Sequence, residues 1–333
     1  MNDILYDERK QFVLNEKAAI NLRGSIEEIV DAICENGYSN IVMIGTGRSY
    51  CHALQLQYIA NMISDVSFYA VRAIDYVFNG MDKVNQESIV IIESAQGDDE
   101  YLIEAVEMCK QRHCRIIGII NDSSSPLASM SDYLISFPVG SLYKRYYVLF
   151  RILYKSDMFD DYEQFCEMLE KVPEICIQAG KRFMNNLAGT AAAIAGADNL
   201  VLVGDGIIWE QVNSYCMYSL EESLWIRSQS INVGDLFHGA IEVIDKNSTV
   251  IIFKGTDESS VIADRAYRYL TRICGNVVMI DIASYIPENS LGNYKKLLTP
   301  FIFKMIQNML NKSLEIELRH PLSIRRYVGN LEF

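Results

Sequence analysis

The sequence predicts an α/β fold with two doubly wound parallel-sheet lobes in tandem. Short apolar runs such as Ile41–Ile44 are typical of parallel strands that are buried on both faces. Helical stretches alternate with these runs, which indicates right-handed crossover connections. The same order of runs recurs in the second half of the chain, so we expect a second lobe with the topology of the first.

The first half contains five predicted strands. Residues 8–36 precede them and carry apolar residues at helix spacing until Gly37. A Gly-Thr-Gly turn at 45–47 follows the first strand, and helices are expected over 49–64 and 98–112. The five strands are expected at 41–44, 67–72, 88–93, 115–120 and 132–137.

The second half repeats the pattern. NLVLVGDG at 199–206 matches NIVMIGTG at 40–47, since each is an apolar run that ends in Gly-x-Gly. The first and third strands are separated by 48 residues in the first half and 50 in the second, and the third and fourth by 27 in both. These offsets indicate an internal duplication. Ligands of such sheets bind at the carboxyl ends of the strands.

The predicted division of the chain has five parts. A helical connector, broken around Pro173, joins the two lobes, and a helix over about Pro300–Lys312 leads into a basic tail. The parts are N-terminal helices at 1–36, the first lobe at 37–155, the connector at 156–195, the second lobe at 196–290, and the C-terminal helix and tail at 291–333.

Composition excludes several classes of function. The 333 residues carry a net charge of −13, which argues against nucleic-acid binding. The N-terminus lacks a signal-peptide core and no apolar run approaches the length of a membrane span, so we expect a cytoplasmic protein. The eight cysteines form no CxxC pair and are expected to be thiols. Cys109, His113 and Cys114 lack a second ligand pair, so no metal site is predicted.

The stretch from Glu221 to Glu242 is the strongest candidate for chemistry. Two adjacent carboxylates on a helical run are followed by an extended segment, a Gly-Asp break and the lone histidine His238. A helix carboxylate and a loop imidazole that share a cleft can move a proton between neighbouring carbons. The alternative is that Glu221 and Glu222 form a solvated helix face and that His238 is an ordinary turn residue. From composition alone this alternative is stronger, because glutamates on helices are usually exposed.

Taken together, the motifs resemble the double SIS (sugar isomerase) domain family. The resemblance covers the whole chain and implies flavodoxin-like lobes similar to those of fructosamine-6-phosphate deglycases and of the isomerase half of glucosamine-6-phosphate synthase. The glutaminase half of the synthase is absent. The segments that carry the resemblance are GTGRSY at 45–50, SAQGDDE at 94–100, EESLW at 221–225, GDLFHGAIEVID at 234–245, GTDES at 255–259 and RRYVGNLEF at 325–333.

The resemblance implies specific roles. In the family, the catalytic pair is a glutamate and the histidine of a His-Gly turn sixteen residues later. This spacing selects Glu222 over Glu221 as the base and His238 as the general acid–base. No cofactor is implied, and the family's histidine can come from the partner chain of a homodimer. The implied substrate and phosphate ligands are Gly47, Arg48, Ser49, Ser94, Gln96, Gly97 and Asp99, with Glu242, Arg325 and Arg326 as accessory residues.

The phosphate loop departs from the family pattern SxSGxT. Gln96 replaces the second serine and Asp99 replaces the threonine, and a carboxylate repels a phosphate. Arg48 is expected either to supply the missing positive charge as a bidentate clamp or to pair with Asp98 or Asp99.

Three functions are compatible with these residues. The leading interpretation is a deglycase that acts on a phosphorylated sugar-amine. The second is an aldose–ketose phosphosugar isomerase, and the third is a sugar-phosphate sensor without catalysis. The presence of both Glu222 and His238 favours the two enzymes, because a sensor needs neither.

Overall fold

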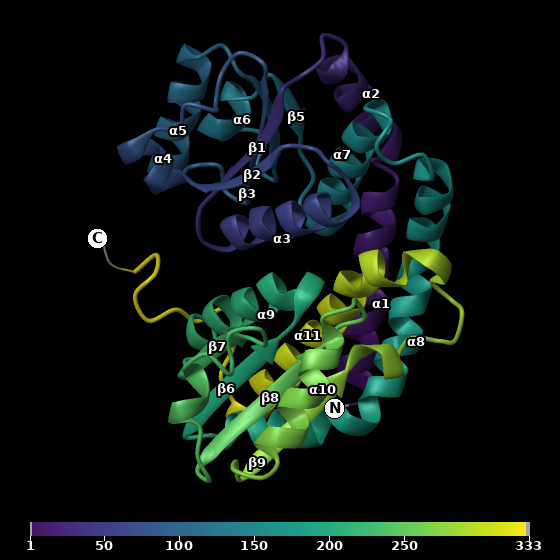
Figure 1. Ribbon diagram of the computed structural model, residues 1–333, viewed down its shortest axis with the longest axis vertical. Coiled ribbons are helices and arrows are strands. Elements are labelled where there is room, and N and C mark those ends of the chain that lie inside the picture. Colours follow the sequence, from purple (N-terminus) through teal and green to yellow (C-terminus); the bar gives the residue numbers. More distant parts are fainter. Residues whose placement is uncertain (1, 331–333) are drawn as a thin grey trace. The chain divides into compact units, whose positions relative to one another are not determined.

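Two separate parallel sheets form the framework of this protein in the computed structural model, which describes residues 2–330 and their side chains from residue 11 onward. Two short stretches lie outside the described residues. They are Met1, at the start of the predicted N-terminal helices, and residues 331–333, at the end of the tail motif. The chain divides into a first lobe, Leu14–Glu170, and a second lobe, Met1–Val13 with Lys171–Phe333 (Figure 1). None of the helices within residues 2–330 combines the length and hydrophobicity that crossing a membrane requires.

The first lobe is built on a five-stranded sheet in the order β2-β1-β3-β4-β5. Its strands are β1 Asn40–Gly45, β2 Phe68–Arg72, β3 Ser88–Ser94, β4 Arg115–Ile120 and β5 Tyr133–Ile135. Every pairing is parallel, and Ile44 lies opposite Val71 on one side and Ile92 on the other. The helices are α1 Asn2–Ile20, which begins in the second lobe, α2 Arg23–Cys34, α3 Gly47–Ile63, α4 Ala73–Asn79, α5 Glu100–Gln111, α6 Pro126–Met130 and α7 Ser141–Lys155.

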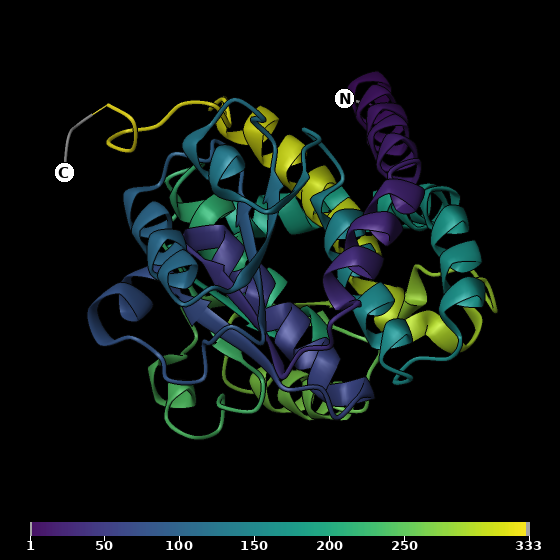
Figure 2. The same cartoon turned by 90° about the horizontal axis from the view of Figure 1, so that it is seen from above.

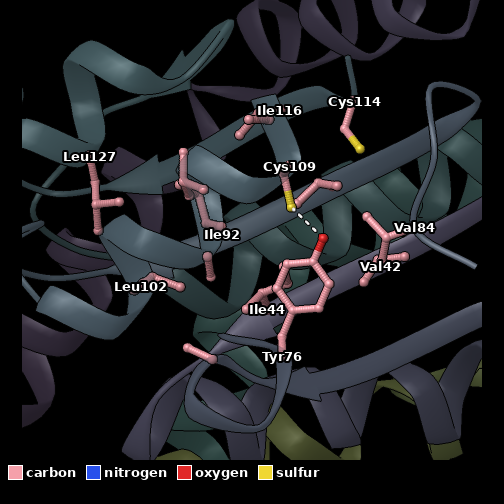
Figure 3. Close-up of a cluster of buried hydrophobic side chains, with 14 of the residues drawn as sticks. Val42, Ile44, Tyr76, Val84, Ile92, Leu102, Cys109, Cys114, Ile116 and Leu127 are labelled. Atoms are coloured by element: carbon pink, nitrogen blue, oxygen red, sulfur yellow. Dashed lines mark hydrogen bonds between the residues drawn. The ribbon is translucent and has the colours of Figure 1, made fainter. Parts of the chain in front are cut away.

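Helices cover both faces of this sheet. Alternate strand residues such as Val42, Ile44 and Ile92 pack with α4, α5 and α6 on one face, while α3 and α7 contact the strands and one another. The Cys109 thiol of α5 donates to the Tyr76 hydroxyl of α4 at 3.7 Å within this core (Figure 3). Both faces are therefore buried, as a doubly wound sheet requires.

The second lobe is built on a four-stranded parallel sheet in the order β7-β6-β8-β9, which matches the first four positions of the other sheet. Its strands are β6 Asn199–Gly204, β7 Ser228–Asn232, β8 Ser248–Lys254 and β9 Asn276–Asp281. The predicted α/β fold and repeated strand order are confirmed. Helical segments are α8 Tyr162–Ala195, which begins in the first lobe, η1 Gly206–Ile208, α9 Trp209–Tyr215, η2 Cys216–Glu221, η3 Ala240–Val243, α10 Ser260–Leu270, η4 Ile282–Ser284, η5 Gly292–Tyr294 and α11 Lys295–Leu318.

Aromatic side chains cover one face of the second sheet. The Phe253 ring of β8 meets Tyr215 of α9 at 6.1 Å and Phe303 of α11 at 5.0 Å, both edge to face. The opposite face packs against α10 and the segment that follows β7. Beyond α11 the chain continues as a tail of turns and loops, yellow in Figures 1 and 2.

Two predictions about prolines were wrong. Helix α8 runs through Pro173 without a break, and α11 begins five residues before Pro300. Proline removes the hydrogen bond that residue 173 would donate to the carbonyl of Leu169. The buried Tyr143 hydroxyl donates to that carbonyl at 3.2 Å instead, so the acceptor that proline leaves is satisfied. Tyr143, 30 positions before Pro173, thus supplies the hydrogen bond to Leu169 that the helix backbone lacks at this point.

Candidate active site

A π-helical turn positions Glu222. In η2 the backbone bonds span five residues, and the Glu222 N–H donates to the Met217 carbonyl at 3.0 Å. Such wide turns are rare and occur frequently at functional sites. Three residues later Trp225 has a φ of 58°, a left-handed conformation that is strained for a bulky side chain. Two unusual backbone features therefore flank this carboxylate.

Glu222 lines a pocket of about 380 Å³ in the second lobe. Its Oε1 accepts from Nε of Arg325 at 2.7 Å, and both side chains are about a quarter exposed. The remaining lining mixes carboxylate, guanidinium and aromatic groups. The lining residues are Glu221, Glu222, Trp225, Ile226, Arg227, Arg325, Arg326, Tyr327 and Val328.

Local bonds hold the tail that supplies Arg325. Its Nη1 donates to the carbonyls of Leu322 and Ile324 at 2.6 and 3.1 Å. The Arg326 guanidinium lies 4.3 Å from the centre of the Trp225 ring, a cation–π distance. The Trp225 ring also meets His320 at 4.3 Å. The predicted accessory arginines are thus brought to the pocket that contains Glu222.

His238 and Glu242 lie elsewhere in the second lobe. Both are exposed, and neither lines the Glu222 pocket. The His238 N–H closes a turn by donating to the Asp235 carbonyl at 2.9 Å, and Glu242 lies in η3. The structure does not bring Glu222 and His238 together around this pocket.

The predicted phosphate ligands of the first lobe follow two adjacent strands. Gly47, Arg48 and Ser49 follow β1. Ser94 is the last residue of β3, which pairs with β1, and Gln96 and Gly97 follow it. The Ser49 hydroxyl accepts from the Thr46 N–H at 3.0 Å, and the Ser94 hydroxyl accepts from the Gly97 N–H at 2.9 Å. These bonds preorganise two loops at one edge of the sheet, where ligands of such folds bind.

Gly97 and Asp99 have structural reasons for their identities. Gly97 has a φ of 74°, and a Cβ there would lie 2.1 Å from the Ser125 hydroxyl oxygen, so only glycine fits. Asp99 is the N-cap of α5, and its Oδ1 accepts from the Leu102 N–H at 2.8 Å. Aspartate is one of the favoured N-cap residues, so Asp99 has a structural role at the start of α5.

The equivalent loops of the second lobe are filled by carboxylates. Asp205 after β6 accepts from the Gly255 N–H at 2.8 Å, and Asp257 after β8 accepts from the Ile207 N–H at 2.6 Å. Burial raises the pKa of Asp205 to about 7; the Gly255 N–H opposes this shift, and Asp257 adds to it. Backbone groups that could hold an anion are therefore occupied by carboxylates here, whereas in the first lobe the Gly97 N–H donates to the Ser94 hydroxyl and not to a carboxylate.

A buried ionic cluster lies beneath the first-lobe loops. Glu93, the residue before Ser94, accepts from Arg145 of α7 at 2.6 Å and lies 2.8 Å from Nδ1 of His52 in α3. Burial would raise the pKa of Glu93, but Arg145 and then His52 outweigh it and hold this pKa at about 2. Burial, and then Arg145, lower the pKa of His52.

Sequence reasoning assigned no role to this cluster or to Trp225 and Arg227. The sequence contains one signal of the cluster, which is Glu93 at the end of the apolar run SIVIIE. A carboxylate in a buried strand requires a charged or hydrogen-bonding partner. Its partners come from helices 41 and 52 residues away, and no local pattern identifies them. Arg227 lies two residues after Trp225. The sequence does not reveal that it lines a pocket, because residues 325–328 of the tail form the rest of that lining.

The chain is similar to known proteins along most of its length. Residues 37–143 match the SIS domain family. The chain is 26% identical over 259 residues to a fructosamine deglycase of Bacillus subtilis (strain 168), covering 75% of this chain and 79% of that protein. It is 22% identical over 322 residues to a fructoselysine 6-phosphate deglycase of Escherichia coli (strain K12), covering 92% and 90%.

One solved structure supports the same fold. It is a Salmonella typhimurium LT2 protein assigned as a phosphosugar isomerase, with a TM-score of 0.86 and 19% sequence identity. The match covers 93% of this chain and 99% of that chain.

Proposed function

We propose, from the match of residues 37–143 to the SIS domain family, that this chain is a deglycase that cleaves a 6-phosphofructosamine to glucose 6-phosphate and a free amine. The observation that carries the proposal is Glu222, a carboxylate at a π-helical turn, in a pocket, held by Arg325. The names of the two curated relatives agree with this reaction.

The proposed chemistry is a proton shift between two carbons, followed by hydrolysis. Glu222 removes a proton from C1, the carbon that bears the amine, while a general acid protonates the C2 carbonyl oxygen, so the C1–C2 bond becomes the double bond of an enaminol. The proton that Glu222 holds returns to C2 and the nitrogen gives up its N–H proton, which moves the double bond to C1–N, gives an imine and restores the general acid. Water adds to the imine, and the C1–N bond breaks to release amine and aldehyde. No electrons are gained or lost overall, so the residues act by holding and moving protons.

The Arg325 contact suits this role. It fixes Oε1 of Glu222 in one position while the carboxylate stays partly exposed to the pocket. A general base must lie within hydrogen-bond reach of the proton it removes. A carboxylate that is already fixed in position loses less conformational entropy when it reaches that geometry.

We propose that His238 acts as the general acid–base in a homodimer. Its exposed turn lies away from the pocket lining of its own chain, which agrees with donation to a partner's site. Mixing inactive Glu222→Gln with inactive His238→Ala tests this, because a mixed dimer has one site with both groups. Refolding them together should restore about a quarter of wild-type activity, given random pairing in a twofold dimer. No recovery, or a monomer in analytical ultracentrifugation, would contradict the proposal.

We propose that the first-lobe loops bind the phosphate. Their hydroxyls and glycine backbone are preorganised, Arg48 is exposed at the first turn of α3, and the second-lobe counterparts are filled by Asp205 and Asp257. A helix start and a nearby guanidinium are a common combination for phosphate.

An aldose–ketose phosphosugar isomerase is the second candidate, because the Salmonella structure has the same fold. Both reactions begin with the same proton shift and differ in whether an amine leaves. Incubation with a panel of 6-phosphofructosamines, with detection of glucose 6-phosphate and free amine, decides between them. Release of both products in equal amounts supports the deglycase. Conversion of a phosphoketose without any amine release supports the isomerase, and binding without turnover supports a sensor.

A further inference from the structure

Two cysteines lie together at the C-terminal end of α5, and neither takes part in the proposed reaction. Cys109 belongs to the last turn of this helix, and Cys114 is the residue before β4. They are 0% and 6% exposed, in the first-lobe core shown in Figure 3. Free cysteines in a core usually serve as small apolar residues, so a chemical role requires further observations at this end of the helix.

The cap of the helix brings the two side chains to one another. Arg112 is the C-cap, and His113 follows with a φ of 58° and donates its N–H to the Lys110 carbonyl at 2.9 Å. The Cys114 N–H donates to the Cys109 carbonyl at 3.1 Å. These two bonds define a Schellman cap, in which the side chains at the positions of Cys109 and Cys114 commonly contact each other.

We infer that Cys114 is a reactive thiol with Cys109 as its resolving partner, and that a small hydroperoxide oxidises this pair to a reversible disulfide. A disulfide needs two Cα atoms about 4.4–6.8 Å apart. The backbone hydrogen bond limits the Cα separation of these residues to roughly 7 Å at ordinary bond lengths. The link can therefore close with little movement of the backbone. The inference is independent of the proposed function.

The surroundings of Cys114 favour the thiolate, which is the form that reacts. A hydrogen bond with the Cys109 side chain lowers the pKa of Cys114, burial opposes this shift, and the Arg112 guanidinium adds to it. The same hydrogen bond, and then burial, raise the pKa of Cys109. Cys109 has one thiol proton, which bonds the Tyr76 hydroxyl at 3.7 Å and turns to Cys114 when that residue ionises. The pair thus consists of an attacking thiolate and a neutral thiol.

A polar pocket gives an oxidant access to Cys114. The pocket measures about 540 Å³, and its lining includes Asn85, whose carbonyl accepts from the Cys114 thiol at 3.2 Å. Arg112 also lines it and is fixed there by bonds of 2.9 Å to the carbonyls of Met81 and Val84. Because Cys114 is only 6% exposed behind this lining, a hydroperoxide fits better than a bulky disulfide.

The reaction balances with the hydroperoxide as the oxidant. Cys114 gives up its proton, and its thiolate attacks the terminal oxygen of the hydroperoxide. The O–O bond breaks, so Cys114 becomes a sulfenic acid, and the other oxygen takes the proton and leaves as an alcohol, or as water from hydrogen peroxide. The Cys109 sulfur then attacks the Cys114 sulfur, the S–O bond breaks, and water leaves with the Cys109 proton. Two thiols lose two electrons and the peroxide gains them.

Cys274 is the matched control in the second lobe. It lies just before β9, and its N–H donates to the Leu270 carbonyl of α10 at 2.8 Å. Leu270, which has no thiol, thus stands where α5 has Cys109. Cys274 is also more exposed than Cys114. If exposure alone governed oxidation, Cys274 would react first.

Peptide mapping of the wild-type protein tests the inference. The reduced, folded protein is treated with hydrogen peroxide and then unfolded, and its remaining thiols are alkylated. Trypsin cuts after Lys110 and Arg112, so Cys109 and Cys114 fall on different peptides. We expect mass spectrometry to find these peptides linked, and dithiothreitol to separate them. Cys114 should become protected from alkylation at least about tenfold faster than Cys274.

Two variants separate the roles of the cysteines. In Cys109→Ala, dimedone should trap a sulfenic acid at Cys114, because no partner resolves it. In Cys114→Ala, Cys109 should stay reduced. Circular dichroism checks that each variant is folded, and the wild-type map decides without them if one is not. Faster oxidation of Cys274, a link from Cys114 to a different cysteine, or oxidation of wild-type Cys114 to a sulfinic acid without the Cys109 link would each overturn the inference.

Discussion

Glu93 is expected to stabilise the first lobe through its charge. It is 8% exposed and bonds Arg145, itself 3% exposed, at 2.6 Å. A carboxyl pKa lowered from 4.5 to about 2 corresponds to about 3 kcal/mol of folding free energy. Because the folded pKa lies below the unfolded value, this contribution is fully present above about pH 4.5 and is lost as the pH falls towards 2.

Glu93→Gln removes the charge and keeps the shape of the side chain. It leaves the buried Arg145 guanidinium without its counter-charge, and breaking one partner of a buried ion pair typically costs about 3–5 kcal/mol. We therefore expect a loss of at least about 3 kcal/mol in urea unfolding at pH 7, followed by circular dichroism. The difference from wild type should shrink steadily between pH 4.5 and pH 2.5.

Glu258→Gln is the matched control. Glu258 also pairs with a cation, Lys296 at 2.6 Å, but its side chain is 79% exposed, so we expect little change. If Glu93→Gln destabilises the protein equally at pH 7 and pH 3, its charge does not provide the stability and the reasoning is wrong.

Three further predictions concern catalysis, phosphate and helix α8. Glu222→Gln should lose about 100-fold or more in kcat while Glu221→Gln keeps most of it; equal losses in steady-state assays would refute the assignment of the base. Arg48→Ala should raise KM for a phosphorylated substrate by roughly tenfold with less effect on kcat, and an unchanged KM would contradict the phosphate site. Tyr143→Phe should cost about 1 kcal/mol in urea unfolding, and a smaller cost after Pro173→Ala, which restores the backbone donor, would support the account of α8.

The sequence determined the architecture because its signals are local. Runs such as SIVIIE predict buried strands, glycines that need a positive φ or close packing mark the turns, and the repeated spacing predicts a second lobe. The strand and turn signals each lie within about ten residues, and the repeat is found by comparing such runs along the chain, so none of them requires knowledge of distant partners. The predicted pairing of Glu222 with His238 also came from spacing, through the family resemblance, and it stays a prediction.

Only the tertiary structure decided which distant charges meet. Arg325 reaches Glu222 across 103 residues, and Glu93 finds His52 and Arg145 on two different helices. Pro173 was misread for the same reason, because the hydroxyl that satisfies Leu169 belongs to another helix. Burial removes water as a partner, so each buried polar group must find another partner wherever the fold brings one near. That pairing depends on three-dimensional proximity, which the order of residues along the chain does not display.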